Sequence, residues 1–349
     1  DPEKVDLYFE SKGGKIRSPE FPLKKRNDQA TFYRLSFTAQ AAAQGYWWVD
    51  FYDENRTSLP DINSALYASE EPMRQEGVFF ADPRACSARI SFVTMQGVYV
   101  RDVRLEQISP AEAAAWCDNL YASLPQKTFF TSGDAFVLLP GTKAALNNGT
   151  FWRILMLGDS IVNDTWCSNF QALVMRDFPK ARLDFRISVR GSTGVWFYRE
   201  PMHFQEYVGR FKPDLVMIGG ISNVRNQGIV EDPENDMNSV IQQCRDIGAE
   251  VVVMSPALSY KWRKTAAPAP WSENWVNEKG WRPYRRDYQF AVTEKTRTAY
   301  WDLTTVPCSI LSDCLQESSW FSRDEVHNND RGKQLIGQNL AAWFRMAKE

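Results

Sequence analysis

The stretch RILMLGDS, residues 153–160, decides the fold of the C-terminal part of the chain. Its apolar residues form a continuous run rather than an alternating one, which is typical of a strand buried on both faces of a parallel sheet. Gly158 ends the run, and Asp159 and Ser160, two residues that cap helices well, follow it. The stretch therefore predicts a buried strand, a turn and a helix that begins near residue 161.

The same alternation of strand and helix continues to the C-terminus. Further strand-like segments occupy residues 183–189, 215–218, 250–254 and 298–303. Helix-like segments occupy residues 161–177, 203–211, 233–247 and 332–347. Strands that alternate with helices indicate a parallel sheet with helices on both faces. We therefore predict an α/β fold for residues 151–349.

The N-terminal part of the chain has the pattern of an all-β structure. Residues 31–37, 88–94 and 98–108 alternate between apolar and polar side chains, and residues 46–52 (YWWVDFY) are mostly aromatic. Short strands separated by turn residues indicate a β-sandwich. The segment VYVRDVRLEQI at residues 98–108 resembles the closing strand of jelly-roll modules of the carbohydrate-binding type.

These patterns divide the chain into three parts. We predict a jelly-roll-like β-sandwich at residues 1–109, a helical connection at 110–150 and the α/β unit at 151–349. Residues 111–124 should form a helix, because Ser109 can cap it and Pro125 stops it. The rest of the connection carries turn residues but no clear periodicity.

The composition argues against several classes of function. The net charge is −2, so no basic field predicts binding to nucleic acid or to an anionic membrane. No apolar run approaches the roughly 18–20 residues that a membrane helix needs. The chain has only two histidines and no Cys-x-x-Cys pair, which argues against a zinc site. Phosphate-loop and dinucleotide fingerprints are absent from the sequence, so we expect neither a metal nor a cofactor.

The cysteines and the start of the chain bear on the cellular compartment. The six cysteines are Cys86, Cys117, Cys167, Cys244, Cys308 and Cys314. Cys308 and Cys314 bracket a short loop, and a disulfide between them would fit an oxidising compartment. The alternative is that most of the six are buried thiols. The chain starts without a methionine or an apolar signal stretch, and we expect a secreted or periplasmic protein whose signal peptide has been removed.

Residues suited to nucleophilic catalysis follow the predicted strands. Ser160, Gly191 and Asn223 come after the first three strands, and Asp324 and His327 lie before the last helix. In parallel sheets, groups after the strands meet at the carboxyl edge of the sheet. A serine needs a neighbouring base, an imidazole is the usual base, and an aspartate usually orients the imidazole. The spacing therefore predicts one site for nucleophilic chemistry.

The ordered set of residues resembles the SGNH (GDSL-type) hydrolase superfamily over about residues 150–349. In that family the blocks carry Gly-Asp-Ser, a glycine, a glycine followed by asparagine, and Asp-x-x-His. The resemblance implies a three-layer, flavodoxin-like fold. It also implies that Ser160 is the nucleophile, His327 the general base and Asp324 its orienting group. The implied oxyanion hole comprises the backbone N–H groups of Ser160 and Gly191 and the side-chain amide of Asn223.

Two features depart from the family pattern. The third block has one more residue than usual between Gly220 and Asn223, and no aspartate follows the asparagine. The second block offers Gly194 as an alternative to Gly191, which lies nearer the strand end. Each of the motif residues alone could be a helix cap or a turn residue. The nucleophile elbow of α/β-hydrolases is absent, because Val162 stands where that motif needs its second glycine.

Aromatic and basic residues gather near the predicted site. An insertion at residues 259–288 leaves the catalytic edge of the sheet, and two arginines flank the oxyanion donors. The candidate substrate-binding residues are Arg190, Trp196, Arg225, Trp262, Trp271, Trp275 and Trp281. The insertion is either a self-packed Ω-loop or a surface on which sugar rings stack. In the second case its basic residues suit an acidic or sulfated polysaccharide.

We therefore predict a carbohydrate esterase that removes acyl groups, most simply acetyl groups, from a polysaccharide through an acyl-serine intermediate. The alternatives are a lipase or acyl-thioesterase, a hydrolase of carbohydrate sulfate esters, and a glycan-binding protein with a vestigial catalytic part. The N-terminal sandwich either binds glycan through Trp47 or Trp48 or only supports the α/β unit.

Overall fold

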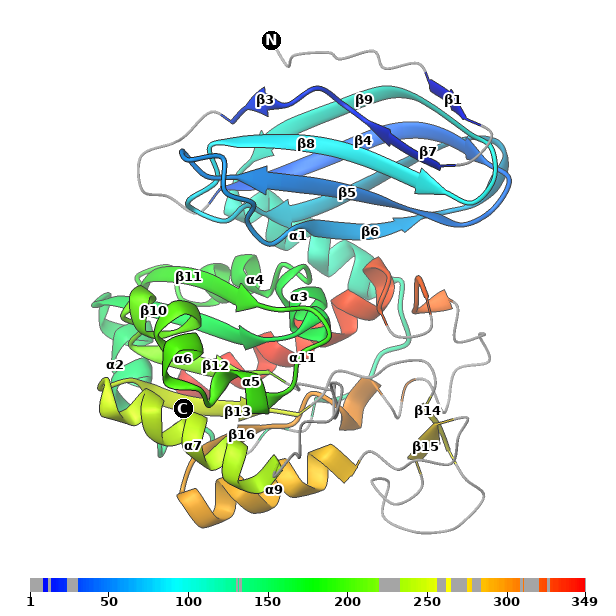
Figure 1. Ribbon diagram of the computed structural model, residues 1–349. Helices are drawn as coiled ribbons and strands as arrows, with labels where there is room; N and C mark the ends of the chain where they lie inside the picture. Colours follow the sequence, from blue (N-terminus) through cyan, green and yellow to red (C-terminus); the bar gives the residue numbers. More distant parts are fainter. Residues whose placement is uncertain are drawn as a thin grey trace.

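The structure is a computed structural model with an N-terminal β-sandwich stacked on an α/β part (Figure 1). It describes residues 9–11, 14–23, 31–129, 131, 134–219, 233–255, 262–264, 275–277, 284–307, 310, 320–324 and 327–348. Within these ranges, no helix is long and apolar enough to cross a membrane.

Two antiparallel sheets form the N-terminal part. Their orders are β1-β9-β4-β7 and β2-β8-β5-β6, with β3 paired to β8. The strands are β1 (Phe9–Ser11), β2 (Gly14–Arg17), β3 (Phe21–Pro22), β4 (Phe32–Ala41), β5 (Gly45–Tyr52), β6 (Ile62–Leu66), β7 (Ser69–Phe80), β8 (Ser87–Thr94) and β9 (Val98–Ile108). The sheets pack face to face, since Phe37 of β4 meets Phe92 of β8 with ring centroids 4.9 Å apart.

A five-stranded parallel sheet forms the centre of the α/β part. Its strands are β10 (Phe151–Gly158), β11 (Arg182–Val189), β12 (Leu215–Ile218), β13 (Glu250–Met254) and β16 (Ala299–Trp301). Their order is β11-β10-β12-β13-β16, and all neighbours are parallel. This is the 2-1-3-4-5 order of flavodoxin-like folds. The predicted α/β fold is therefore confirmed. A separate short pair, β14 (Trp262–Lys264) and β15 (Trp275–Asn277), is antiparallel.

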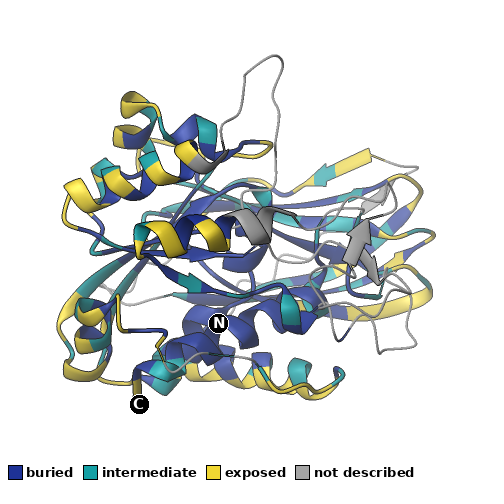
Figure 2. Ribbon diagram, turned by 90° about the horizontal axis from the view of Figure 1, so that it is seen from below, coloured by how far each residue is buried: buried dark blue, intermediate teal, exposed yellow. Residues whose placement is uncertain are grey.

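Successive side chains of the central strands enter two different cores. Ile154 and Met156 of β10 join one apolar cluster, whereas Leu155 and Leu157 join another. Because both faces are covered, the strand is apolar throughout rather than alternating. Figure 2 shows the buried sheet between helices, some of which have exposed outer faces whereas others, such as α11, are buried along their length.

The helices divide between the two faces of the sheet. The first cluster contains residues of α1 (Pro110–Ala122), α3 (Ser160–Trp166), α4 (Phe170–Asp177) and α11 (Asp330–Arg345). The second contains residues of α5 (Val195–Tyr198), α6 (Pro201–Tyr207), α7 (Pro233–Asp246) and α9 (Tyr284–Thr296). The helix predicted at residues 111–124 is α1, and the Ser109 side chain and Glu112 form a capping box at its start.

Three helical segments differ from the sequence prediction. Residues 161–177 form two helices rather than one, because Asn169 adopts a left-handed conformation with φ of 59° and donates to the Val78 carbonyl at 2.7 Å. The segment predicted at 203–211 splits into α6 and the 3₁₀ helix η1 (Gly209–Phe211). The connection contains α2 (Pro140–Asn148), whose first amides donate to the Glu250 carboxylate on β13. A final 3₁₀ helix, η3 (Met346–Lys348), follows α11.

The sandwich and the α/β part share an apolar interface. Phe80 at the end of β7 meets Trp166 at the end of α3 with ring centroids 5.3 Å apart. Helix α11 is buried along almost its whole length, and its Lys333 ammonium donates to the carbonyl of Asn63 in the sandwich. The sandwich therefore covers the helical layer that lies over one face of the parallel sheet.

The described cysteines are thiols in closed surroundings. Cys117, Cys167 and Cys244 are buried, and Cys86 is half-buried. Burial raises the pKa of Cys117 to about 12 and that of Cys167 to about 11, so neither is a reactive thiolate at neutral pH. The predicted disulfide between Cys308 and Cys314 lies outside the described residues.

Candidate active site

Ser160 stands at the carboxyl edge of the parallel sheet, where β10 ends and α3 begins. Asp159 caps α3, because its carboxylate accepts a hydrogen bond from the Ile161 amide at 2.9 Å. A Cβ atom on Gly158 or Gly219 would lie only 2.2 or 2.0 Å from the Val162 side chain. Glycine at these two strand ends therefore lets α3 approach the sheet and fixes the position of Ser160.

His327 connects Ser160 to Asp324. Its Nε2 lies 3.0 Å from Ser160 Oγ, and its Nδ1 lies 3.1 and 3.0 Å from the two carboxylate oxygens of Asp324. Since a carboxylate only accepts hydrogen bonds, we assign the proton to Nδ1, which leaves Nε2 to accept from the serine hydroxyl. Asp324 Oδ1 also accepts from the backbone amide of His327 at 2.8 Å. The Asp-x-x-His spacing thus lets one carboxylate hold both the backbone and the ring of the histidine.

A buried charge cluster fixes the loop that carries Asp324 and His327. Asp164, one turn after Ser160 on α3, accepts from Arg323 Nη1 at 2.7 Å and from the Asn328 amide at 2.8 Å. Lys333 Nζ lies 3.9 Å from the same carboxylate. The side chains of Asp164, Arg323 and Lys333 are 0%, 7% and 2% exposed. The cluster therefore ties the helix of the candidate nucleophile to the loop of the candidate base.

The charges in this cluster depend on one another. Burial disfavours the Arg323 cation, but the nearby Asp164 carboxylate outweighs burial, and the pKa of Arg323 rises above its ordinary value. The guanidinium also donates to the Asn328 carbonyl at 2.8 Å. Arg323 therefore keeps its positive charge and is held beside the site by Asp164 and the Asn328 carbonyl.

The sandwich also contacts the loop that carries Asp324 and His327. The carbonyl of Arg323 accepts hydrogen bonds from Gln44 Nε2 at 3.2 Å and from the Tyr46 hydroxyl at 3.4 Å. Burial, together with the Asp324 carboxylate, raises the pKa of Tyr46, so its hydroxyl keeps its proton at neutral pH. Asn163 Nδ2 on α3 donates to the Asp61 carbonyl at 3.0 Å. Both sides of the site are therefore fastened to the sandwich.

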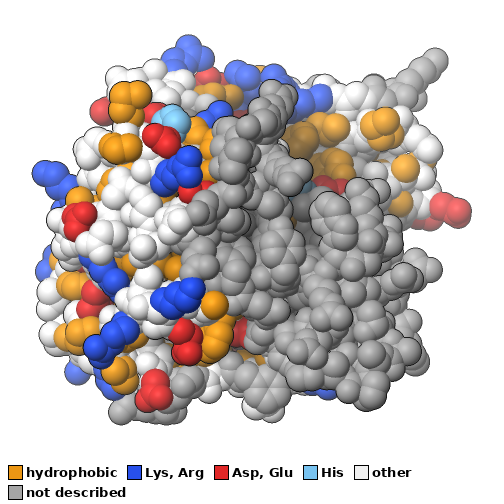
Figure 3. All heavy atoms as spheres, turned by 60° about the horizontal axis from the view of Figure 1, so that its bottom comes forward, with side chains coloured by type: hydrophobic (Ala, Val, Ile, Leu, Met, Phe, Trp, Pro, Cys, Tyr) orange, Lys and Arg blue, Asp and Glu red, His pale blue; other side chains and the backbone are white. Residues whose placement is uncertain are grey.

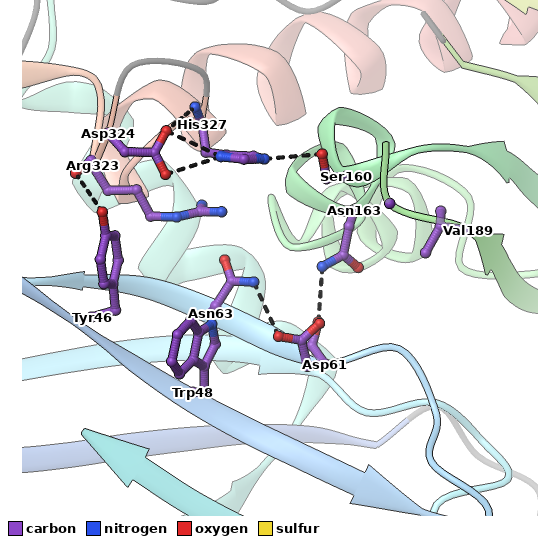
Figure 4. A pocket seen from close by; sticks show the side chains of 11 residues that line it. Tyr46, Trp48, Asp61, Asn63, Ser160, Asn163, Val189, Arg323, Asp324 and His327 are labelled. Carbon is purple, nitrogen blue, oxygen red and sulfur yellow. Dashed lines mark hydrogen bonds and ion pairs between the residues drawn. The ribbon is translucent and has the colours of Figure 1, made fainter. Parts of the chain in front are cut away.

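A pocket of about 420 Å³ opens where the two parts of the protein meet (Figure 4). It is lined by Tyr46, Trp48, Asp61, Asn63, Ser160, Asn163, Val189, Gly191, Arg323, Asp324 and His327. The first four residues come from the sandwich and the others from the α/β part. The pocket thus places an aromatic wall opposite the Ser160–His327 pair.

Gly191, a predicted oxyanion donor, lies in this pocket. A Cβ atom there would meet no protein atom within 4 Å, and the backbone does not have the positive φ that favours glycine. The described fold therefore does not require glycine at this position. A substrate group that approaches the Gly191 amide closely would require it, because a side chain would stand in its way. The third predicted donor, Asn223, lies outside the described residues.

The predicted substrate-binding residues are not found together in the described pocket. Arg190 stacks on the Phe197 ring, with its guanidinium carbon 4.1 Å from the centroid, and Trp196 packs edge-on against the same ring. Neither belongs to the described lining. Only the backbones of Trp262 and Trp275 are described, in β14 and β15, and Arg225, Trp271 and Trp281 lie outside the described residues.

Sequence patterns alone did not assign the sandwich residues to the site. Tyr46 and Trp48 lie on β5, more than a hundred residues before Ser160, and only tertiary packing brings them near it. The useful signal is the alternation along β5, where Trp47 is 2% exposed inside the sandwich and its two neighbours face outward. Of the two tryptophans considered for sugar binding, only Trp48 lines the pocket.

Two observations concern metal binding and the charge of one face of the protein. Among the described residues, no group of three or more His, Cys, Asp or Glu side chains is arranged to hold a metal ion. On the described part of the face in Figure 3, lysine and arginine are interspersed with aspartate and glutamate. The other histidine, His203, stacks on Phe197 with ring centroids 3.8 Å apart and is not part of the described lining.

No protein-family model and no curated protein matches the chain. Similar solved structures include an acetylxylan esterase from Geobacillus stearothermophilus, 14% identical over 56% of this chain and 95% of that one, with a TM-score of 0.43. A two-domain esterase active on acetylated mannans is 14% identical over 61% of this chain and 53% of that one, with a TM-score of 0.46. A putative lipolytic protein of the G-D-S-L family from Desulfitobacterium hafniense is 12% identical over 55% and 98% of the two chains, with a TM-score of 0.38. Because these TM-scores are below 0.5, the fold and the site are inferred from this chain alone.

Proposed function

We propose that this protein is a serine esterase of the SGNH type that removes acyl groups, most simply acetyl groups, from a polysaccharide. The observation that carries the proposal is the series of hydrogen bonds from Asp324 through His327 to Ser160 at the wall of a pocket. A serine held at 3.0 Å from an imidazole nitrogen, with a carboxylate on the other nitrogen, is the arrangement that activates a hydroxyl nucleophile.

The reaction follows from this geometry. Ser160 Oγ attacks the ester carbonyl while His327 Nε2 takes the hydroxyl proton, and Asp324 stabilises the imidazolium that forms. Collapse of the tetrahedral intermediate releases the sugar hydroxyl, which receives its proton from His327. Water then attacks the acyl-serine while His327 Nε2 takes a proton from it. Collapse of the second tetrahedral intermediate releases the carboxylic acid, and His327 returns the proton to Ser160 Oγ.

The developing oxyanion needs hydrogen-bond donors. The backbone amides of Ser160 and Gly191 support this role, since Ser160 begins a helix and Gly191 lines the same pocket. Asn223 is the third donor that we propose, from its place after the third strand. Each such donor is worth about 10²–10³ in kcat.

The polysaccharide substrate is supported by the aromatic side of the pocket, where Tyr46 and Trp48 line the same cavity as Ser160. Flat aromatic rings bury apolar surface while polar groups nearby remain hydrogen-bonded, which suits a sugar ring. An enzyme that acts on a polysaccharide must be in the same compartment as its substrate. We therefore propose a secreted or periplasmic location.

The test is release of acetate and of sulfate from a panel of acetylated and sulfated polysaccharides, with p-nitrophenyl acetate as the small ester. We expect acetate from at least one polymer and none from the Ser160→Ala variant. Sulfate release that depends on Ser160 would replace the carboxylic esterase with a sulfate-ester hydrolase. Binding of polymer without any product would favour a glycan-binding protein instead.

A further inference from the structure

The sandwich side of the pocket carries two aromatic rings, a carboxylate and an amide. Tyr46 and Trp48 lie two residues apart on β5, so both point away from the sandwich core. Their rings are nearly parallel, with an interplanar angle of 15° and centroids 5.8 Å apart. Asn63 of β6 is the cross-strand partner of Trp48, and Asp61 lies next to β6. Figure 4 shows these four side chains on one side of the pocket and Ser160, His327 and Asp324 on the other.

We propose that Tyr46, Trp48 and Asp61 form the sugar-binding wall of the catalytic pocket, and that this wall selects a neutral sugar residue over an anionic one. The inference rests on the proposed esterase function and narrows its substrate from polysaccharides in general to those with an uncharged backbone. It also makes the sandwich part of the active site rather than a separate binding module.

The aromatic pair is suited to a sugar ring. Two rings that stand side by side on a regular strand are already ordered, so little conformational freedom is lost when a ligand packs on them. Trp47 is not equivalent, because it is inside the sandwich against Gly77, where a Cβ atom would lie 2.4 Å from the indole. The strand therefore presents Trp48 to the pocket and keeps Trp47 for the core.

Asp61 supplies the hydroxyl-binding capacity. One of its carboxylate oxygens accepts from Asn63 Nδ2 at 3.3 Å. A carboxylate offers about four acceptor positions, so capacity remains for the hydroxyl groups of a sugar. A hydrogen bond from a hydroxyl to an ionised carboxylate is stronger than one between two neutral groups.

The charges of the described lining disfavour an anionic sugar. Asp61 and Asp324 are both carboxylates, and the one cation of that lining, Arg323, is buried against Asp164. Lys15 lies 4.8 Å from the centre of the Trp48 ring, but its side chain is exposed and its charge is screened by solvent. A carboxylated or sulfated sugar between the two walls would meet like charges, which is how a site rejects a competing ligand.

The experiment compares two pocket variants with two matched controls. Trp48→Ala and Asp61→Asn change the proposed wall. Tyr52→Ala and Asp50→Asn change the same residue classes on the same face of β5, outside the described lining. For each protein, kcat/KM is measured on acetylated glucomannan, whose backbone is neutral, on acetylated polygalacturonate, whose backbone is anionic, and on p-nitrophenyl acetate.

The wild-type protein should prefer glucomannan to polygalacturonate. Trp48→Ala should lower the ratio of glucomannan activity to p-nitrophenyl acetate activity by about tenfold or more, the usual effect of removing an aromatic anchor. Asp61→Asn should lower activity on glucomannan and raise it on polygalacturonate, because the variant keeps the size of the side chain and loses its charge. The two controls should change the ratios by less than about twofold, as expected for surface positions outside a binding site.

A second readout does not depend on turnover. In the Ser160→Ala background, the Kd for glucomannan oligosaccharides is measured by calorimetry with Trp48 present, with Trp48→Phe and with Trp48→Ala. Weaker binding that Trp48→Phe partly restores supports the aromatic wall, and Trp48→Phe also covers the case in which the alanine variant fails to fold. Circular dichroism of each variant reports the fold.

The outcomes distinguish a failure of the proposed sugar-binding wall from a failure of the proposed esterase function. Ester hydrolysis that depends on Ser160, combined with pocket variants that behave like the controls, overturns the sugar-binding wall and leaves the esterase intact. A wild-type preference for polygalacturonate that Asp61→Asn does not increase overturns the selection against charge. Absence of hydrolysis of every ester, the small one included, removes the proposed esterase and this inference with it.

Discussion

Asp164 is the residue whose replacement should affect stability most strongly for its size. It has no exposed area and faces two buried cations, Arg323 at 2.7 Å and Lys333 at 3.9 Å. Asp164→Asn keeps the volume of the side chain but removes the carboxylate that forms an ion pair with both cations. Removing one partner from a buried ion pair costs about 3–5 kcal/mol, because the remaining charge is buried and uncompensated. Since each 1.4 kcal/mol is about a factor of ten, the unfolded fraction should rise by on the order of 10³.

The assay is urea denaturation at neutral pH, followed by tryptophan fluorescence, with the free energy of unfolding extrapolated to water. The matched control is Asp102→Asn, which removes an ion pair with Arg101 at the surface, where the side chains are 51% and 42% exposed. Exposed pairs contribute at most about 1 kcal/mol. Under conditions in which Asp164→Asn remains folded, kcat should also fall by roughly tenfold or more, because the helix of Ser160 is no longer tied to the loop of His327. If Asp164→Asn is within about 1 kcal/mol of the wild-type protein, the cluster does not hold the site together.

Two further predictions concern single positions. Gly191→Ala should leave the free energy of unfolding within about 1 kcal/mol of wild type, because the added Cβ meets no protein atom, and should lower kcat/KM on an ester. An unchanged kcat/KM would exclude a close approach of substrate to this amide. Burial raises the pKa of Asp330 above its ordinary value of 3.8, with Lys333, Arg323 and Arg331 opposing the shift. The stability linked to its protonation is therefore complete below pH 3.8 and is lost as pH rises through the folded-state pKa, so the stability of wild type relative to Asp330→Asn should decrease between roughly pH 3 and pH 7. Unfolding free energies of both proteins across this range test the sign, and a difference that grows with pH contradicts it.

The central strands were predictable because burial on both faces of the sheet leads to apolar residues at successive positions of the sequence. Residues 215–218 and 251–254 are continuous apolar runs, and they coincide with β12 and with all but the first residue of β13. Each of these strands lies between two helical layers, so no position has to be polar. The start of α3 was predictable for a similar reason, since the capping side chain of Asp159 is local.

The elements that were not predicted depend on distant partners. Helix α2 begins without a side-chain cap of its own and is instead capped by Glu250, more than a hundred residues later in the chain. The break before α4 is held by a hydrogen bond from Asn169 to Val78 in the sandwich. No pattern in a local window of sequence contains these contacts.

The candidate site likewise combines residues that were predictable from the sequence with residues that depend on distant partners. The order of Ser160, Asp324 and His327 after predicted strands was enough to expect them together, and hydrogen bonds join them in the structure. The contribution that we propose for Tyr46, Trp48 and Asp61 depends on how the sandwich packs on the α/β part. Of these residues, the sequence analysis named only Trp48, as an alternative to Trp47.

The central claim is that Ser160 is a nucleophile activated by His327. The most direct test is covalent labelling with a fluorophosphonate probe, which reacts with activated serines, followed by peptide mass spectrometry. We predict one equivalent of label on the peptide that contains Ser160, no label in Ser160→Ala, and labelling slowed by on the order of 10³ or more in His327→Ala. A folded wild-type protein that takes up no label, or takes it up at another residue, would contradict the claim.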